Sequence, residues 1–589
     1  MINYKSAIFQ KRLNFYLQLA LIGVSGLAVV CLIMEYGFFV SSELEDTLHQ
    51  LDFLAAGIMA GQLFLKLVLS PDKRAFLQNN KIDFTVIFIF LCLFLGITGI
   101  FRVPKVFPFL KNKGFLSLSY SYLLLSQLYI LVFLGLRIPQ INKLVVIFKL
   151  KPPLVVITTF VLIIGVGTFL LLLPHSTVLG KHTSFLDALF TATSATCVTG
   201  LIVVDTGAHF STLGQLIILV LIQIGGLGLM TFTSFFALVL GRGFGVRDRV
   251  LLRDIFSYQD MGKLGSLILS ILKVTFVFEA LGAVLLYLQF LPQAKNGLSA
   301  AYSAIFHSIS AFCNAGFSLY SDSFIRYQSS LGINLTMSGL IITGGLGFTV
   351  IVNLLRIGYA RFKGKREILS LQSKLVLLVS GVLILLGTSL LYLAERHGVA
   401  DGLSLKNSIL GAYFQAVTAR TAGFNTLNIA KLTIPSSFLL IMLMFIGASP
   451  GSTGGGIKTS TFAILIFTIK SLVKGRERVE AFKRTIPKMV VYQALCVVIL
   501  ALGWIGISTF LLSFTEKASF LNILFEDLSA FGTVGLSRGL TPHLSTAGRV
   551  IIMLTMLVGR TGPLTLALAI GGRKAAELYE YPEERVVIG

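Results

Sequence analysis

Charged residues are scarce in this sequence, and their scarcity argues against a soluble protein. They make up 13% of the 589 residues, whereas soluble globular proteins carry about a quarter. Hydrophobic residues make up 55%, and runs such as 154–173 are long enough to cross a hydrocarbon core, which takes about 20 residues. We therefore expect an all-α polytopic membrane protein with no soluble domain of any size.

Patterns of enzyme chemistry are also missing. The Gly-x-x-x-x-Gly-Lys-Ser/Thr motif that cradles phosphate does not occur, so this chain alone is not expected to be an ATPase. The sequence contains no nucleophile–base pattern and no metal-ligand spacing, and its five cysteines lie in or beside apolar runs. We expect no catalytic residues, no covalently bound cofactor and no enzymatic activity.

Acidic residues are few, 26 against 49 lysines and arginines, which gives a formal net charge of +23. The basic residues concentrate in short loops at 242–263, 356–366 and 470–484, and these loops alternate with loops that hold few. Such alternation marks cytoplasmic loops and places both termini in the cytoplasm. The charge therefore indicates topology and contact with membrane lipids rather than nucleic-acid binding, in a multi-pass protein of the cell (inner) membrane.

Apolar runs predict twelve membrane spans. Four lie in an N-terminal region, eight follow, and the tenth is long and interrupted at its centre. The spans are predicted at 13–39, 51–69, 82–101, 115–137, 154–173, 212–240, 267–290, 336–355, 374–393, 437–470, 490–512 and 546–569.

The last eight spans contain an internal repeat. Four outward-facing loops end in a similar segment, in which a glycine follows an aromatic residue by ten positions and precedes a bulky apolar residue. Three of the four segments also carry Ser-Ala at the sixth and fifth positions before the glycine. The glycines lie 116, 107 and 112 residues apart, at Gly200, Gly316, Gly423 and Gly535. That spacing fits two spans and one intervening loop in each repeat.

Each segment has the composition of a re-entrant loop. The stretch before the glycine is too short to span a bilayer but long enough for a short helix that enters partway. Irregular backbone at membrane depth is tolerated where it lines a water-filled path, and glycine permits backbone angles that turn carbonyls inward. We predict four short helices that aim their negative ends at a cation held by rings of carbonyl oxygens. A small-residue helix-packing motif is the alternative, which four matched copies disfavour.

The predicted filter residues, which would hold the cation, are Thr196, Cys197, Val198, Thr199 and Gly200 in the first segment, Cys313, Asn314, Ala315 and Gly316 in the second, Thr421, Ala422 and Gly423 in the third, and Thr533, Val534 and Gly535 in the fourth.

The interrupted span 437–470 predicts a break in the membrane helix. Its centre carries five glycines and a proline, which cannot hold a continuous helix. We predict a flexible loop below the filter, with a plain kink as the alternative. Arg560 lies inside the last span, where a guanidinium is costly unless it is paired or hydrated. The candidate functional residues here are Gly447, Gly451, Ser452, Thr453, Gly454, Gly455, Gly456, Lys458 and Arg560; for Lys458, simply reaching the cytoplasmic interface is an equal alternative.

The repeated segments resemble those of the Trk/Ktr/HKT superfamily of potassium transporters. The resemblance covers about 154–570 and rests on Thr-Cys-Val-Thr-Gly-Leu at 196–201, Cys-Asn-Ala-Gly-Phe at 313–317, Arg-Thr-Ala-Gly-Phe-Asn at 420–425 and Phe-Gly-Thr-Val-Gly-Leu at 531–536. It implies four membrane–pore-loop–membrane repeats in a pseudo-fourfold arrangement, homodimers with one pore per subunit, and potassium as the substrate, held as K⁺ at the filter residues. It also implies that the candidate residues in and near the interrupted span form an intramembrane gate. In the family the arginine that matches Arg560 lies near this gate loop, so we expect Arg560 to contact carbonyls of 447–456. In this family, glycine at all four filter positions goes with potassium preference, and serine at the first is linked to sodium permeability in some plant members.

The resemblance also implies a partner. Family members usually couple to a cytosolic nucleotide-binding ring of the RCK type, which would here be a separate subunit docked on the basic loops. A nucleotide would then act only through that subunit. A sodium-selective or sodium-coupled transporter of the same fold is the alternative function. A membrane enzyme or receptor scaffold is a weaker one, because no His, Asp and Glu cluster converges at membrane depth.

Residues 1–150 lie outside the resemblance. The sequence places Lys66 and Asp83 where an intramembrane pair of a voltage-sensor-like bundle would stand, but the fourth span offers Arg137 and two lysines rather than regularly spaced arginines. We therefore expect a structural or regulatory region. The predicted domains are the N-terminal four-span region 1–150, pore repeat 1 at 151–262, pore repeat 2 at 263–366, pore repeat 3 with the gate loop at 367–485, and pore repeat 4 with a cytoplasmic tail at 486–589.

Overall fold

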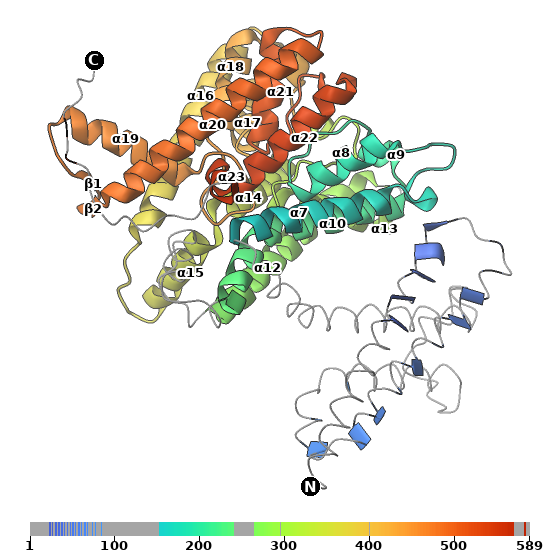
Figure 1. The fold of residues 1–589 in the computed structure, drawn as a ribbon. Helices are drawn as coiled ribbons and strands as arrows, with labels where there is room; N and C mark the ends of the chain where they lie inside the picture. Colours follow the sequence, from blue (N-terminus) through green and yellow to red (C-terminus); the bar gives the residue numbers. More distant parts are fainter. Residues whose placement is uncertain are drawn as a thin grey trace, which may run out of the picture. The chain divides into compact units, whose positions relative to one another are not determined.

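The computed structural model describes residues 152–240 and 264–570, except Lys295 and Ala400, with scattered positions between 23 and 84 and at 582 and 584. The chain divides into two units (Figure 1): unit 1 is Met1–Leu150 with Leu173–Leu179, and unit 2 is Lys151–Leu172 with Gly180–Gly589. The predictions for the N-terminal spans at 82–101 and 115–137, and for Lys66, Asp83 and Arg137, lie outside the described residues.

The described part of unit 2 is mostly helical with several apolar helices, and this aspect of the predicted fold is confirmed. The helices are α7 (Pro152–Leu171), α8 (Phe185–Thr196), α9 (Thr206–His209), α10 (Thr212–Leu240), α12 (Leu264–Phe290), α13 (Gly297–Phe312), α14 (Leu331–Leu346), α15 (Phe348–Phe362), α16 (Leu371–Glu395), α17 (Leu405–Thr418), α18 (Ile434–Phe445), α19 (Thr459–Val473), α20 (Lys488–Thr515), α21 (Phe520–Phe531), α22 (Thr546–Thr561) and α23 (Pro563–Ile570). Short 3₁₀ turns lie at Pro174–Ser176, Leu291–Gln293, Ile325–Tyr327, Ile429–Lys431 and Thr541–His543.

Four short helices, α8, α13, α17 and α21, form the first part of the four repeated segments, which we call the glycine segments. Each begins at a side-chain cap that accepts a hydrogen bond from the backbone N–H three residues later, a strong local start signal. The capping residues are Ser184, Asn296, Ser404 and Ser519. Each helix ends four or five residues before its glycine. The stretches that the sequence predicted as short helices are therefore helical until a few residues before each glycine.

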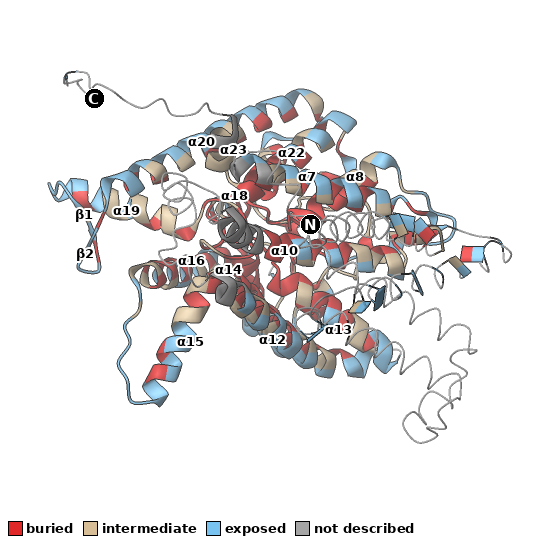
Figure 2. Ribbon diagram, turned by 60° about the horizontal axis from the view of Figure 1, so that its bottom comes forward, coloured by how far each residue is buried: buried red, intermediate tan, exposed pale blue. Residues whose placement is uncertain are grey.

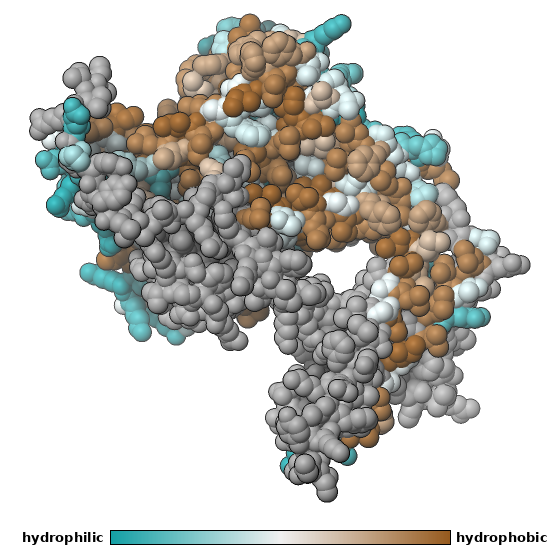
Figure 3. Space-filling view, viewed as in Figure 1, coloured by the Kyte–Doolittle hydropathy of each residue, from teal (hydrophilic) through white to brown (hydrophobic). Residues whose placement is uncertain are grey.

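The outer helices expose apolar side chains, as a membrane protein requires. Leu502, Phe510 and Phe514 on α20 are 55%, 62% and 76% exposed. In Figure 3, hydrophobic side chains gather over α20, α22 and α7. By length and composition, three of the described helical stretches can cross a membrane, namely Leu269–Gln293, Leu371–Glu395 and Lys488–Thr515, with the bent pair α14–α15 as a fourth span.

The span predicted at 336–355 is not one continuous helix, which corrects that prediction. It is divided into α14 and α15, which meet at an angle of 103°. Gly347 lies between them with φ +89°, and a Cβ there would lie 2.5 Å from the carbonyl oxygen of Pro450. The N–H of Phe348 donates to the carbonyl of Gly451 at 2.8 Å. Gly347 therefore bends the chain so that it contacts the loop after α18.

A small β-hairpin corrects the all-α description. Strands β1 (Val479–Ala481) and β2 (Arg484–Ile486) pair antiparallel in a basic loop. Phe482 and Lys483 connect them with φ +51° and +62°, the backbone of a two-residue hairpin turn. Because this turn lacks the usual glycine or asparagine, the sequence offered no signal for it.

Candidate functional site

The four glycines form one closed ring, which we call the glycine ring. Each has a positive φ, between +73° and +90°. A Cβ on any of them would meet the carbonyl oxygen of the residue just before the next glycine along the chain, and the fourth glycine returns to the first. The pairs are Gly200 with Ala315, Gly316 with Ala422 at 2.8 Å, Gly423 with Val534, and Gly535 with Thr199. An ion pair at 2.5 Å between Asp187 of α8 and Arg549 of α22 also joins the first and last quarters.

The residue two positions before each glycine shares an unusual conformation. All four have a positive φ although none is glycine, and such strain persists only where the surroundings impose it. They are Val198 (+58°), Asn314 (+59°), Thr421 (+82°) and Thr533 (+50°). The Asn314 amide and the Thr421 hydroxyl are hydrogen-bonded at 3.1 Å. The predicted filter residues thus come together around one axis, in the buried interior that Figure 2 shows in red.

The Ser-Ala pairs hold the glycine segments in place, a role that the repeat did not reveal. Ser194 and Ser529 accept hydrogen bonds at 3.1 Å from the N–H groups of Gly200 and Gly535. Ser310 instead donates to the carbonyl of Phe317 at 2.8 Å. In the third segment a valine stands at this position, and α17 ends one residue earlier relative to its glycine than the other three short helices.

Glycines on the following helices press against the ends of three short helices. A Cβ on Gly225 of α10, Gly344 of α14 or Gly559 of α22 would meet the last carbonyl of α8, α13 or α21, respectively. Small residues that allow such close approach are typical of membrane helix interfaces.

We expect Gly559→Ala to lower the apparent melting temperature of the purified protein, because its Cβ would overlap the main-chain oxygen of Phe531. Overpacking of this kind costs about 1–3 kcal/mol. Gly503→Ala on α20 is the matched control, since that glycine is exposed with no atom within 4 Å of a Cβ. There alanine should gain up to about 1 kcal/mol of helix propensity. Equal melting temperatures for the two variants would contradict the close packing at Gly559.

The loop between α18 and α19 lies against the glycine segments. The N–H of Gly455 donates to the hydroxyl of Thr533 at 2.9 Å. The Thr453 hydroxyl donates to the carbonyl of Phe312 at 3.2 Å. A Cβ on Gly454 would contact the Thr421 hydroxyl. We call residues 446–458 the crossing loop, since it touches three of the four segments.

Backbone hydrogen bonds hold the crossing loop against the end of α14. The N–H groups of Ser449 and Thr453 donate to the carbonyls of Gly345 and Gly344 at the end of α14, at 3.0 and 3.3 Å. Within the loop, a Cβ on Gly447 would meet the carbonyl of Gly455. The hydroxyl of Ser452 donates to the carbonyl of Ser449 at 2.6 Å. Gly451 and Gly456 both have a positive φ. The predicted gate residues of this region thus belong to one ordered, non-helical loop.

Arg560 of α22 joins the crossing loop to the first repeat. Its guanidinium donates to the carbonyls of Thr453 and Gly225 through Nη1 and Nη2, and the residue is 2% exposed. Among the described residues, its Nε has no partner. Lys458, which is partly buried, donates from Nζ to the carbonyl of Gly454 at 2.7 Å. Two cationic side chains therefore hold the crossing loop.

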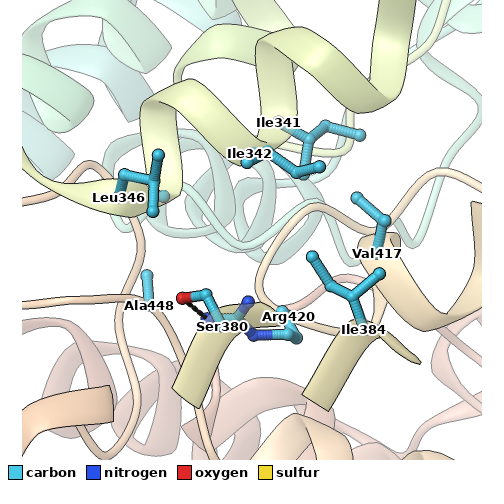
Figure 4. A pocket seen from close by; sticks show the side chains of 9 residues that line it. Ile341, Ile342, Leu346, Ser380, Ile384, Val417, Arg420 and Ala448 are labelled. Atoms are coloured by element: carbon cyan, nitrogen blue, oxygen red, sulfur yellow. Dashed lines mark hydrogen bonds between the residues drawn. The ribbon is translucent and has the colours of Figure 1, made fainter. Parts of the chain in front are cut away.

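Arg420 sets the third segment apart (Figure 4). It is 9% exposed, and its described hydrogen bond runs from Nη2 to the Ser380 hydroxyl of α16 at 3.2 Å. A cavity of about 20 Å³ lies beside it, large enough for a water molecule. The cavity is lined by Ile341, Ile342, Gly345, Leu346, Ser380, Ile384, Val417, Arg420 and Ala448.

The chemistry at the ring is that of backbone oxygen. Across the described part of the chain, no three His, Cys, Asp or Glu side chains gather as a metal site. The ring instead presents carbonyl groups, with hydroxyls that have no described partner on Thr196 and Thr199. Oxygen ligands of this type suit hard cations.

Comparisons with known proteins agree with this picture. Residues 149–573 match the family model for TrkH, described as a cation transport protein. The chain is 39% identical to the Ktr system potassium uptake protein B of Bacillus subtilis, over 76% of this chain and 99% of that one. It is 37% identical to the potassium/sodium uptake protein NtpJ of Enterococcus hirae, over 75% and 98%. The crystal structure of the potassium transporter TrkH from Vibrio parahaemolyticus matches with a TM-score of 0.58 at 18% identity, covering 84% of this chain and 97% of that one.

Proposed function

This chain belongs to the TrkH family of cation transport proteins, and we propose that it takes up potassium ions across the cytoplasmic membrane. The glycine ring carries the proposal, because it brings four equivalent backbone segments to one axis. The names of its relatives support potassium as the ion, since several are potassium uptake proteins.

In the proposed mechanism the predicted filter residues replace the hydration shell of K⁺. Four membrane–pore-loop–membrane repeats, in a pseudo-fourfold arrangement, would each supply one segment of carbonyl oxygens. The short helices α8, α13, α17 and α21 end beside these segments. Their C-terminal ends carry partial negative charge, which favours a cation at the centre. Because every ligand comes from a fixed backbone, little reorganisation is needed when the ion enters.

We assign the gate to the crossing loop and Arg560. The loop hydrogen-bonds to Thr533 and Phe312 in two of the segments, so an ion leaving the filter would meet it next. Arg560 fastens the loop and adds a positive charge that opposes a cation in a low-dielectric surrounding. Opening requires the loop to exchange these bonds, which the glycines at 451, 454, 455 and 456 permit.

Sodium transport is the second candidate, and one relative supports it directly by its name, which includes both potassium and sodium. Glycine at all four ring positions favours potassium over this alternative. Radiotracer uptake of Rb⁺ in competition with Na⁺ separates the two: strong inhibition by equimolar Na⁺, or Na⁺-dependent uptake, would favour the sodium-selective or sodium-coupled form.

Partners and location complete the proposal. We assign a homodimer in the cell (inner) membrane, both termini cytoplasmic, with a separate nucleotide-binding ring of the RCK type docked on basic cytoplasmic loops. Exposed basic residues at Arg361, Lys363, Lys474 and Arg484 support such a surface. Contact of these loops with anionic lipid headgroups is the simpler alternative.

We expect this chain to restore growth at low external potassium to a bacterium that lacks its own potassium uptake systems. The strain should also express a ring subunit of the family, so that a missing regulator does not mask activity. An empty vector and the ring subunit alone are the controls. Absence of rescue, with the chain shown to be present in the membrane fraction, would contradict potassium uptake.

A further inference from the structure

The second and fourth glycine segments share a buried polar residue at one position. His307 and Glu526 each lie nine residues before their glycine and are 0% and 1% exposed. Imidazole and carboxylate have little chemistry in common, so the sequence repeat does not mark these two residues as equivalent. Their hydrogen bonds to the backbone show that they take the same role.

His307 holds the turn that follows Gly316. Its Nε2 accepts a hydrogen bond from the N–H of Leu319, the third residue after the glycine, at 3.2 Å. A backbone N–H can only donate, so the ring is neutral and carries its proton on Nδ1. That Nδ1 donates to the carbonyl of Ser303 at 2.7 Å, and the Tyr320 ring stacks on the imidazole at 4.8 Å.

Glu526 holds the turn after Gly535 in the same way. It accepts a hydrogen bond from the N–H of Arg538, again the third residue after the glycine, at 2.9 Å. The hydroxyls of Ser537 and Thr541 donate to its two oxygens at 2.6 Å. The next turn bond also matches: the hydroxyl of Ser537 accepts the N–H of Gly539 at 2.9 Å, as that of Ser318 accepts the N–H of Tyr320 at 3.0 Å.

The third segment uses a different side chain from the adjacent position. Gln415, eight residues before Gly423, is 1% exposed. With its amide oriented to satisfy its neighbours, its oxygen accepts the N–H groups of Thr426 and Leu427 at 3.0 and 3.3 Å. Thr426 is once more the third residue after the glycine. In the first segment Thr191 takes the place of His307 and Glu526, and within the described residues it makes no hydrogen bond to the corresponding turn.

We propose that His307, Gln415 and Glu526 are positioning residues of an outer clamp that sets ion selectivity. They share the ability to accept a backbone N–H, and only Glu526 can carry a negative charge. Each bond fixes the turn that leaves the glycine, and therefore the direction of the neighbouring carbonyls. Ligand geometry of this kind must be held to about 0.5 Å by supporting contacts. The proposal rests on the proposed potassium uptake and assigns its discrimination to these three side chains.

The competing explanation is that Glu526 attracts cations by its charge, and two substitutions separate the explanations. Glu526→Gln keeps an oxygen acceptor without the charge, as Gln415 already does in the third segment. Glu526→Leu removes both. His307→Gln and His307→Leu repeat the comparison where no charge is involved. Thr191→Val is the matched control from the segment that lacks the clamp.

Each variant would be tested by Rb⁺ uptake in cells with the ring subunit present, and the ratio of the Na⁺ inhibition constant to the Rb⁺ KM would be measured. We expect the glutamine variants and Thr191→Val to stay within twofold of the wild-type ratio and the leucine variants to fall at least fivefold. Equal ratios for the glutamine and leucine variants would overturn the clamp. A Rb⁺ KM raised tenfold in Glu526→Gln would overturn it in favour of charge.

Two further observations distinguish a variant that fails to fold, a failure of the clamp and a failure of the proposed function. If a leucine variant does not reach the membrane, Glu526→Gln and His307→Gln still decide: retained ratios support an acceptor role, and lost ratios contradict it. A wild-type chain that takes up no Rb⁺ contradicts the proposed function itself and is recognised before any variant is compared.

Discussion

Replacing Gly316 with serine is expected to reduce the preference for Rb⁺ over Na⁺ at least tenfold, which corresponds to about 1.4 kcal/mol. The new Cβ would lie 2.8 Å from the carbonyl oxygen of Ala422 and 3.2 Å from the Cα of Gly423. A side chain also disfavours the φ of +73° at this position, at a cost of about 1–2 kcal/mol. The Ala422 carbonyl must rotate away, so the ring loses one of its oxygens at the height of the ion.

Gly339→Ser on α14 is the control for this substitution. It adds the same side chain in the same repeat, but Gly339 is exposed and no atom lies within 4 Å of a Cβ. Rb⁺ uptake and Na⁺ competition, measured in the strain used for growth rescue, give the selectivity of both variants. A Gly316→Ser protein that is present in the membrane and keeps wild-type selectivity would show that the glycine ring does not coordinate the transported ion.

Replacing Arg560 with alanine is expected to increase Rb⁺ flux in the absence of the nucleotide-binding ring subunit. Two unit charges about 8 Å apart, at an effective dielectric constant of about 20, repel each other by about 2 kcal/mol, or roughly 30-fold in rate, which sets the scale of the barrier that such a charge can add. The substitution also frees the crossing loop, because the guanidinium donates to the carbonyl of Thr453. Both effects act in the same direction, toward an open path.

Arg560→Lys separates the charge from the fork of hydrogen bonds. Lysine keeps a positive charge but does not reproduce the planar pair of donors that reaches Thr453 and Gly225 together. We expect its flux in proteoliposomes to lie between those of the wild type and Arg560→Ala. Unchanged or lower flux in a folded Arg560→Ala protein, with folding checked by its melting temperature, would exclude Arg560 from the gate.

The sequence predicted those features that are written locally. The family resemblance was correct, and the short helices predicted before the glycines are present, although their caps, such as Ser184 and Ser404, were not predicted. The interruption of the span 437–470 was visible because glycine and proline disfavour a helix wherever they stand. The spacing of the glycines gave the order of the segments along the chain, but not which segments contact each other in space.

Contacts between distant segments were harder to predict. The bend at Gly347 is accompanied by a contact with Gly451, which is about a hundred residues away, so no local pattern announced it. The hydrogen bonds that His307 and Glu526 accept were not predicted. Different side chains accept the backbone N–H group at the same position of each turn, so no residue type repeats in the sequence. The positive φ of Val198 is imposed by its surroundings and runs against the preference of a β-branched residue.

The closing of the glycine ring within one chain has a consequence for how selectivity can be altered. In a channel assembled from four identical subunits, one codon change alters all four quarters together. Here each quarter has its own codons, and the quarters already differ, with His307, Gln415 and Glu526 in three of them. A mutation therefore changes only one of the four segments. If the glycine ring selects the ion as proposed, selectivities between those of the wild type and of a fully altered ring can be reached one segment at a time.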